Sequence, residues 1–145
     1  MSKGRELVIK LPIFLEIGIR KKKKFYLNQN ITRNIVFHLL NSLKKEMKRV
    51  VAGLLNEEVT SWNLARYELE LTLYLPNLLK RDVNNVCGVI EKFATDALVE
   101  LGVLEDDNYN HLQHTSFKYG GYDSNKRGYV LMKVKELDEK DMLEV

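Results

Sequence analysis

Cysteine, proline and long apolar runs are all scarce in this sequence, and each shortage excludes a class of protein. Cys87 is the only cysteine, which excludes an internal disulfide and a cysteine-rich zinc site and favours a cytoplasmic location. Only two prolines occur, and apolar residues are spread along the chain, so low-complexity disorder is not expected. No run of about 18 uncharged apolar residues is present, which predicts no membrane span. The first residues also lack the apolar segment of a signal peptide.

Charge is distributed unevenly along the chain, although the net charge is only +3. Up to Val50 there are 13 Lys/Arg and 3 Asp/Glu, a net charge of +10, whereas the remainder has 10 and 17, a net charge of −7. A basic part beside an acidic part suits a protein that holds a polyanion with one and metal ions with the other. A purely solubilising surface would explain the same distribution. The acidic segment 138–145 is expected to be a frayed tail.

The hydrophobic pattern over residues 1–145 is that of one α+β domain. Residues 67–75 alternate strictly between apolar and polar side chains and predict the clearest strand. Residues 13–19 are apolar and fit more than one kind of element. Further strands are predicted at 7–11, 111–119 and 128–137, the last two as a hairpin joined by the glycine-rich loop 120–127.

Two main helices are predicted to pack on this mixed sheet of about four strands. The first, over about residues 35–52, has Thr32 or Asn34 as its candidate N-cap. The second extends to about Leu101, and Gly102 then stands where a C′ glycine belongs.

Carboxylate and amide side chains gather at both ends of the second helix. They are Asp82, Asn84 and Asn85 at its start, and Glu105, Asp106 and Asp107 after its end. Hydrolysis of a phosphodiester by metal ions needs oxygen ligands of this kind, which hold Mg²⁺ and leave positions open for water and phosphate. Taken singly, Asp82 or Asn84 fits a helix N-cap equally well, and Asp106-Asp107 fits a solvated turn.

The segment from Leu79 to Asp107 resembles the signature of the RusA family of Holliday-junction resolvases. The matching features are Arg81-Asp82-Val83-Asn84-Asn85, Lys92, Asp96-Ala97-Leu98, Gly102 and Asp106-Asp107. The surroundings agree, because the first strand ends at Pro12, the strand before the motif ends at Leu75-Pro76, and Lys118 falls on the strand after the acidic turn.

The resemblance implies a homodimeric, Mg²⁺-dependent endonuclease that resolves four-way junctions or related branched DNA in recombination and repair. Mn²⁺ would substitute for Mg²⁺. Asp82 and Asp107 correspond to the first and third metal-binding aspartates, with Asp106 beside them, and Lys92 is the candidate for the essential lysine. Asn84 occupies the second metal position, where the family has aspartate.

Two departures from the family pattern bear on this interpretation. Asn84 offers a neutral carbonyl oxygen, so both metal affinity and turnover should be lower. The helix is about one turn longer than usual, so Gly88 stands where the lysine is expected and Lys92 lies one turn further on. The alternative is a non-catalytic protein that binds branched DNA on the same scaffold, and a third is a protein-interaction module without salt-dependent DNA affinity.

Helix geometry favours a dimer. Asp82 and Asp107 flank a helix of roughly 17 residues, which at about 1.5 Å per residue is on the order of 25 Å long. Metal ligands lie about 2.1 Å from Mg²⁺, so one chain that does not double back cannot bring both to one ion. A two-fold dimer with antiparallel helices would pair Asp82 of one subunit with Asp107 of the other.

Basic residues of several segments are expected to contact DNA phosphates, so binding should weaken steeply with salt. The candidates are Lys21, Lys22, Lys23, Lys24, Arg81, Lys118, Lys126 and Arg127, with the lysines and arginine of 44–49 in support. Phe25 and Tyr26 follow the basic run and fit either stacking on an unpaired base or packing in the core.

Overall fold

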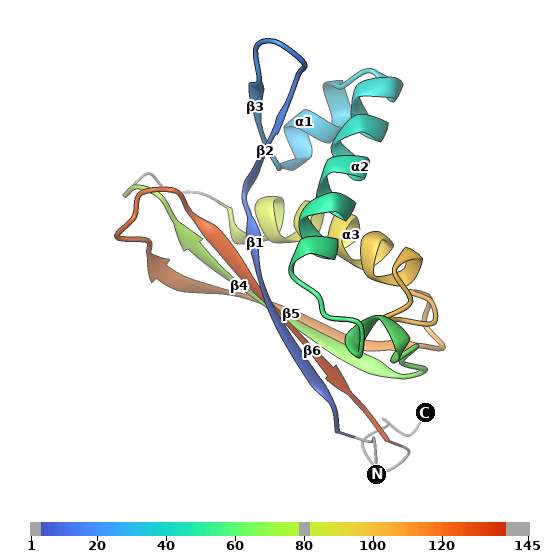
Figure 1. Cartoon of the computed structure of the whole chain (residues 1–145). Coiled ribbons are helices and arrows are strands. Elements are labelled where there is room, and N and C mark those ends of the chain that lie inside the picture. The colour runs from blue at the N-terminus through green and yellow to red at the C-terminus, as the bar shows by residue number, and fades with distance from the viewer. Residues whose placement is uncertain (1–3, 79–81, 139–145) are drawn as a thin grey trace.

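A four-stranded mixed sheet with the strand order β1-β6-β4-β5 organises the fold in the computed structural model, which describes residues 4–78 and 82–138 (Figure 1). Its strands are β1 (Glu6–Pro12), β4 (Tyr67–Leu75), β5 (Leu112–Tyr122) and β6 (Tyr129–Glu136). β6 pairs antiparallel with both β1 and β4, whereas β5 pairs parallel with β4. The predicted mixed sheet of about four strands in an α+β fold is confirmed.

The predicted hairpin between the last two strands is wrong, because β4 lies between β5 and β6. The helix α3 (Val83–Glu100) connects β4 to β5, and such a crossover makes two neighbouring strands parallel. The loop 123–128 then carries the chain past the end of β4 to its other side. Gly120 and Gly121, expected in that loop, belong to β5 itself.

β4 has the predicted bounds and is the most deeply buried strand. Its apolar side of alternating residues from Tyr67 to Leu75 is at most 7% exposed, and these side chains face the helices. The opposite side carries Glu68, Glu70 and Tyr74, which are half-buried, and Thr72, which is buried. The strict alternation in the sequence therefore predicted correctly which face of the sheet each side chain of β4 occupies.

The first predicted helix is two helices, α1 (Gln29–Asn34) and α2 (Phe37–Gly53), separated by extended backbone at Ile35 and Val36. The N-cap is Asn28, whose Oδ1 accepts a hydrogen bond from the Ile31 N–H at 3.0 Å. Thr32 and Asn34, the predicted caps, lie inside α1. A short 3-10 helix, Val59–Ser61, follows α2.

Residues 13–19 contribute a strand of a second, two-stranded sheet that was not predicted. β2 (Phe14–Ile17) pairs antiparallel with β3 (Lys23–Tyr26), so the basic run forms the turn and second strand of a hairpin. Gly18 in this turn has φ +146°, and a Cβ there would collide with the Lys21 carbonyl. The hairpin projects beyond the main sheet (Figure 1).

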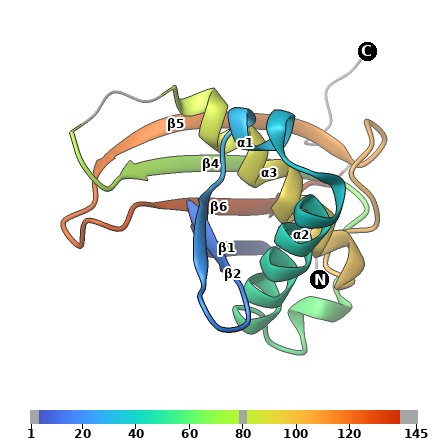
Figure 2. The same ribbon diagram turned by 90° about the horizontal axis from the view of Figure 1, so that it is seen from above.

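All three α-helices cover one face of the sheet, as the view from above shows (Figure 2). α3 lies against the sheet through its buried residues, which include Val86, Ile90, Phe93, Ala94 and Leu98. α2 packs on α3 and buries Leu43, Met47 and Val51, whereas Phe37 at its start is 76% exposed. Within the described residues, no helix combines the length and apolarity that a bilayer crossing requires.

Candidate metal and nucleic-acid site

Asp82 begins α3 as its N-cap. Its Oδ1 accepts hydrogen bonds from the backbone N–H groups of Asn84 at 2.9 Å and Asn85 at 3.4 Å. The carboxylate thus satisfies backbone donors that the first helical turn leaves unpaired. Of the two interpretations of Asp82, the N-cap is confirmed, and the exposed carboxylate also remains accessible to a cation.

The two asparagines after Asp82 have different surroundings. Asn84 is exposed and lies in the first turn of α3. Asn85 is half-buried, and its Oδ1 accepts a hydrogen bond from the Gln29 N–H at 2.8 Å. Asn85 therefore ties the start of α1 to the start of α3, while Asn84 stands beside the Asp82 carboxylate.

The chain doubles back after α3 and brings the acidic turn alongside the helix. Gly102 has φ +86°, and the Val103 N–H donates to the Leu98 carbonyl at 2.9 Å, which reverses the chain direction. The buried hydroxyl of Tyr67 then donates to the Asp106 carbonyl at 2.7 Å. Asp106 and Asp107 are therefore fixed next to the middle of α3 and not beyond its end.

Lys92 lies between two carboxylates at this point. Its Nζ is 3.5 Å from Asp96 Oδ1, one helical turn on, and 3.6 Å from Asp107 Oδ2 in the acidic turn. Asp96 first, and then Asp107, raise the pKa of Lys92 above its ordinary value. The structure thus unites the predicted lysine, the predicted third aspartate and the Asp-Ala-Leu step of the motif.

Glu91 belongs to the same cluster and was not predicted. Burial raises its pKa above the ordinary value, Lys92 lowers it, and Asp107 and Asp96 raise it further. Acidic side chains with a raised pKa beside other carboxylates are common at functional sites. One signal could have revealed Glu91, namely its place four residues after the buried Cys87 and three before the buried Ala94, on the apolar face of α3.

Asp82 and Asp107 remain far apart within one chain. Ten residues of α3 separate Asp82 from Lys92, which at about 1.5 Å per residue is on the order of 15 Å. Because the chain doubles back, Asp82 and Asp107 lie closer together than the full length of α3 would place them. Their expected separation is still well above the distance between two ligands of one metal ion. Among the described residues, no group of three Asp, Glu, His or Cys side chains is close enough to hold a metal ion.

A pocket of about 320 Å³ adjoins the acidic turn and mixes both signs of charge. It is lined by Lys44 and Lys48 of α2, by Asp96 and Glu100 of α3, and by Asp106 and Asp107. Lys48 pairs with Glu100 at 3.0 Å, whereas Lys44 is exposed and has no ion pair in the described part of the chain. Basic side chains of α2 therefore border the carboxylates.

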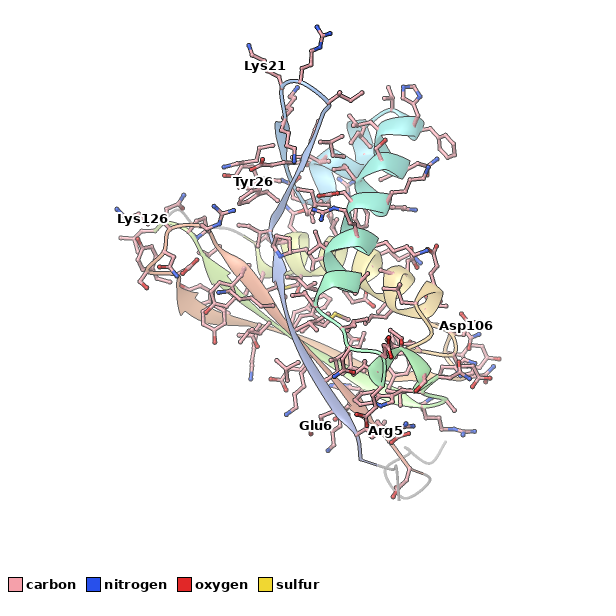
Figure 3. All side chains as sticks on the ribbon, in the orientation of Figure 1. Arg5, Glu6, Lys21, Tyr26, Asp106 and Lys126 are labelled. Carbon is pink, nitrogen blue, oxygen red and sulfur yellow. The ribbon has the colours of Figure 1, made fainter. Side chains whose placement is uncertain are left out.

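The predicted DNA-contacting residues occupy different parts of the molecule. Lys21 stands at the tip of the β2–β3 hairpin and Lys126 on the β5–β6 loop, both far from Asp106 (Figure 3). Lys118 is on β5, where its Nζ pairs with Glu70 Oε1 at 2.6 Å on the sheet face away from the helices. Arg81 lies outside the described residues.

The aromatic residues near the basic run differ in exposure. Phe25 is half-buried and packs against the core, while Tyr26 is 39% exposed. The ring of Phe14 lies 5.6 Å from that of Tyr26, and Lys24 Nζ lies 4.3 Å from the Phe14 ring centroid. The hairpin therefore combines exposed cations with one accessible aromatic ring.

No family model matches the chain, and no curated protein is significantly similar to its sequence.

Proposed function

We propose that the protein is a Mg²⁺-dependent endonuclease of the RusA type that acts on four-way junctions or related branched DNA. The observation that carries this proposal is the contact of Lys92 with Asp107. These two residues come from the two halves of the motif, and the fold brings them to one place beside Asp96 and Glu91. The third interpretation, a protein-interaction module, offers no reason for this cluster.

The side chains at the two proposed half-sites suit a hard divalent cation. Asp82 and Asn84 at one end and Asp106 and Asp107 at the other offer oxygen donors, the ligands that Mg²⁺ prefers. A bound Mg²⁺ would supply Lewis-acid activation of water and of the phosphate. Lys92 would neutralise charge that develops on the phosphate, and burial, with smaller contributions from Asp107 and Asp96, raises the pKa of the neighbouring Glu91.

A homodimer would complete the site. Because about 15 Å of helix separates Asp82 from Lys92, which contacts Asp107, a second chain with α3 antiparallel to the first is the simplest way to unite the two aspartates. Each of two equivalent sites would then take Asp82 from one subunit and Asp107 from the other. Two such sites fit the two symmetric nicks that resolve a four-way junction.

The direct test is to incubate the protein with a synthetic four-way junction in Mg²⁺ or Mn²⁺. We expect symmetric nicks by the wild type, and faster cleavage after Asn84→Asp, which restores a carboxylate to the second position. A negative charge in the first turn also favours the helix, so this variant should fold. Ser61→Asp adds the same charge at an exposed position of the 3-10 helix, which carries none of the proposed ligands, and should leave cleavage unchanged.

The outcomes separate the two leading functions. Cleavage that depends on the metal supports the endonuclease. Junction binding without cleavage, in the wild type and in Asn84→Asp, would instead establish the non-catalytic branched-DNA-binding protein. A protein that does not bind branched DNA would exclude both.

Mixed subunits test the shared site. Asp82→Asn and Asp107→Asn should each abolish cleavage, but a mixture that exchanges subunits forms heterodimers with one intact site. Random exchange should restore about a quarter of the intact sites if each site draws on both chains. No restoration is expected if each chain holds a whole site.

A further inference from the structure

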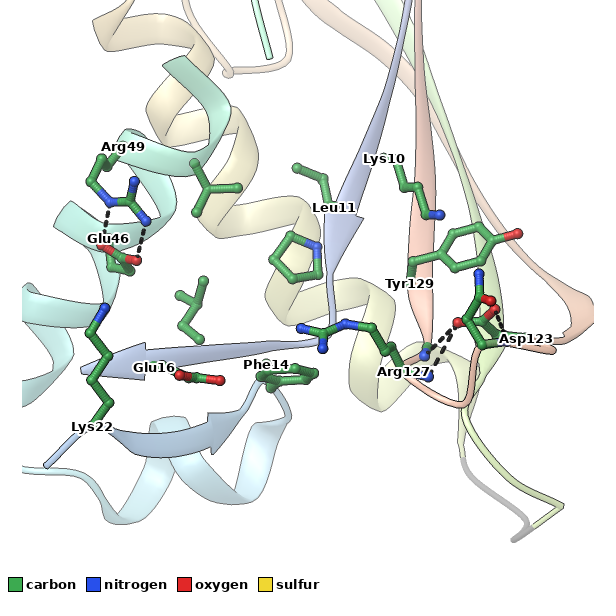
Figure 4. Close-up of a pocket in the computed structure, with 15 residues that line it drawn as sticks. Lys10, Leu11, Phe14, Glu16, Lys22, Glu46, Arg49, Asp123, Arg127 and Tyr129 are labelled. Carbon is green, nitrogen blue, oxygen red and sulfur yellow. Dashed lines mark hydrogen bonds and ion pairs between the residues drawn. The ribbon is translucent and has the colours of Figure 1, made fainter. Parts of the chain in front are cut away.

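A second pocket, of about 440 Å³, shares no lining residue with the pocket at the acidic turn and is bordered by basic residues of four separate segments (Figure 4). They are Lys10 of β1, Lys22 of the β2–β3 turn, Arg49 of α2 and Arg127 of the β5–β6 loop. Its floor includes Pro12, Leu15 and Val50, which are apolar. Segments distant in sequence thus converge on one mixed basic and apolar surface.

Two of the three acidic residues that line this pocket already have hydrogen-bond partners within the protein. The Asp123 carboxylate is 6% exposed and accepts hydrogen bonds from the N–H groups of Asn125 at 3.0 Å and Gly128 at 2.9 Å. The Glu46 carboxylate accepts two hydrogen bonds from the Arg49 guanidinium, at 2.8 and 2.7 Å. Neither Glu16 nor Asp123 forms an ion pair in the described part of the chain.

The basic residues retain more charge than the acidic ones. In the portion of the chain that the structure describes, Lys10, Lys22 and Arg127 form no ion pair. Four basic side chains and three carboxylates line the pocket, an excess of one positive charge. An excess of this kind favours an anionic ligand.

Aromatic rings hold two of these cations in place without neutralising them. The Arg127 guanidinium lies over the Phe14 ring, 5.2 Å from its centroid, and Lys10 Nζ lies 4.2 Å from the centroid of Tyr129. Cation–π contacts restrict the side chain while its charge stays available. The Arg127 backbone is also fixed, because its N–H donates to Asp123 Oδ2 at 3.3 Å.

We propose that this pocket binds the sugar–phosphate backbone of one DNA arm, with Arg127, Lys22 and Lys10 as the phosphate contacts. The proposal rests on DNA being the substrate, and it adds a binding site away from the carboxylates that would do the chemistry. The apolar floor suits deoxyribose between phosphates. Guanidinium and ammonium groups at separate points suit successive phosphates.

The surroundings favour a polymer over a single small anion. The pocket lies where two basic projections meet, the β2–β3 hairpin with Lys21 at its tip and the β5–β6 loop with Lys126 (Figure 3). Positive charge therefore continues from the pocket along both projections. A backbone of regularly spaced phosphates would contact all three regions at once.

The test measures binding to a fluorescent four-way junction by anisotropy, in EDTA so that no cleavage occurs, over a series of salt concentrations. The double variant Lys22→Ala/Arg127→Ala should bind about tenfold more weakly. Its plot of log affinity against log salt should be less steep by about 2, because each lost phosphate contact removes about 0.9 from the slope. Arg127→Lys retains the charge and should lose less.

The matched control is Arg66→Ala/Lys135→Ala, which removes the same charge at the opposite end of the main sheet. We expect its affinity and slope to stay close to those of the wild type. Equal losses in both double variants would show only general charge attraction and would overturn the pocket assignment, as would unchanged binding by the pocket variant. Inorganic phosphate that competes as effectively as the junction would reduce the pocket to a small-anion site.

Different experimental results would contradict the DNA-binding pocket and the endonuclease proposal. Because binding is measured without metal, a pocket that binds DNA in a protein without nuclease activity would support the inference alone. If the wild type cleaves the junction but the substitutions of Lys22 and Arg127 leave its junction affinity unchanged, the result would support the endonuclease alone. Both substituted side chains are exposed, so thermal unfolding should be near that of the wild type.

Discussion

Lys92 contacts Asp107 across the turn that follows α3, with 3.6 Å between Nζ and Oδ2. The same ammonium group is 3.5 Å from Asp96, so it supplies positive charge to a place where three carboxylates, with Glu91, would otherwise repel one another. In the proposed endonuclease, Lys92 would bind a phosphate oxygen while a metal ion neutralises the carboxylates. Its contributions to stability and to the proposed activity can therefore be measured separately.

Lys92→Gln should lower junction cleavage at least tenfold, because the cation that faces the phosphate is lost. The free energy of unfolding should change by less than about 1 kcal/mol, since the Lys92 side chain is 62% exposed and its ion pairs are screened. Cleavage kinetics and urea unfolding measure the two effects. Lys133→Gln, which removes a similar surface pair with Glu6, is the control, and undiminished cleavage by Lys92→Gln would exclude a direct role.

Two substitutions of Asp82 separate its cap from its charge. Asn is as good an N-cap as Asp, so Asp82→Asn should keep the stability of the wild type while abolishing metal-dependent cleavage. Asp82→Ala should abolish cleavage and also reduce the free energy of unfolding by about 1 kcal/mol. Chemical denaturation of both variants gives the comparison. Full activity in Asp82→Asn would show that Asp82 serves only to begin α3.

Glu91→Gln should stabilise the protein at pH 7. The pKa of Glu91 is raised above its ordinary 4.5 in the folded protein, so the folded state binds more protons than the unfolded state between the two values. Stability of the wild type therefore falls as pH rises through that interval, and the glutamine variant avoids this loss.

Urea unfolding at pH 7 and at pH 4 provides the measurement for Glu91→Gln. Its advantage should be largest at pH 7 and should shrink toward pH 4, which lies below the ordinary pKa of 4.5, so that the glutamate is mostly protonated in both states. Glu57→Gln, an exposed carboxyl after α2, should show no such difference. Equal stability of wild type and Glu91→Gln at pH 7 would contradict the argument.

Asp123→Ala should loosen the β5–β6 loop, which carries Arg127. Hydrogen bonds from the N–H groups of Asn125, Gly128 and Arg127 hold the pKa of Asp123 below its ordinary value, although burial opposes this. The stabilisation is thus present at neutral pH and is lost as pH falls through the lowered pKa, below 3.8. Thermal unfolding at pH 7 and pH 3 should show a difference from the wild type that narrows in acid.

The loop prediction has a second readout in hydrogen exchange. Asn125, Arg127 and Gly128 N–H groups should exchange faster in Asp123→Ala, because each loses its acceptor. Asp123→Asn, which keeps one acceptor oxygen, should lie between alanine and the wild type. Unchanged exchange at these three amides would mean that the loop is held by other contacts.

Local patterns in the sequence predicted those elements whose side chains have a clear periodicity. β4 alternates so regularly that its bounds and both of its faces followed from the sequence alone. The end of α3 also followed, because the positive φ of Gly102 suits no other residue so well. These are features that neighbouring residues determine.

Strand pairing and the split of the first helix could not be predicted in the same way. The two last strands are neighbours in sequence, but the burial of β4 on the helix side and its two hydrogen-bonded neighbours place it between them. The extended backbone at Ile35 and Val36 follows no proline or glycine, so nothing local marks the break between α1 and α2. Tertiary packing overrides local propensity at both places.

The sequence predicted which residues belong to the candidate site, but it did not predict how they are arranged in space. The sequence indicated Asp82, Asp107 and Lys92, yet only the turn after α3 shows that Lys92 and Asp107 meet and that Asp82 stays apart. Glu91 escaped notice because a glutamate on a helix is usually a solvated residue. Its raised pKa depends on Asp107, which is remote in sequence.

The position of β6 in the sheet sets the order in which the molecule can be assembled on the ribosome. β6 is the last of these strands to be synthesised, yet it lies between β1 and β4, and Ile9 of the first strand pairs with Met132. The apolar side chains of β1 therefore have no sheet partner until β6 is synthesised, and exposed apolar surface of this kind favours aggregation. A nascent chain arrested before β6 would lack both the closed sheet and the pocket around Lys10, so it should not bind DNA.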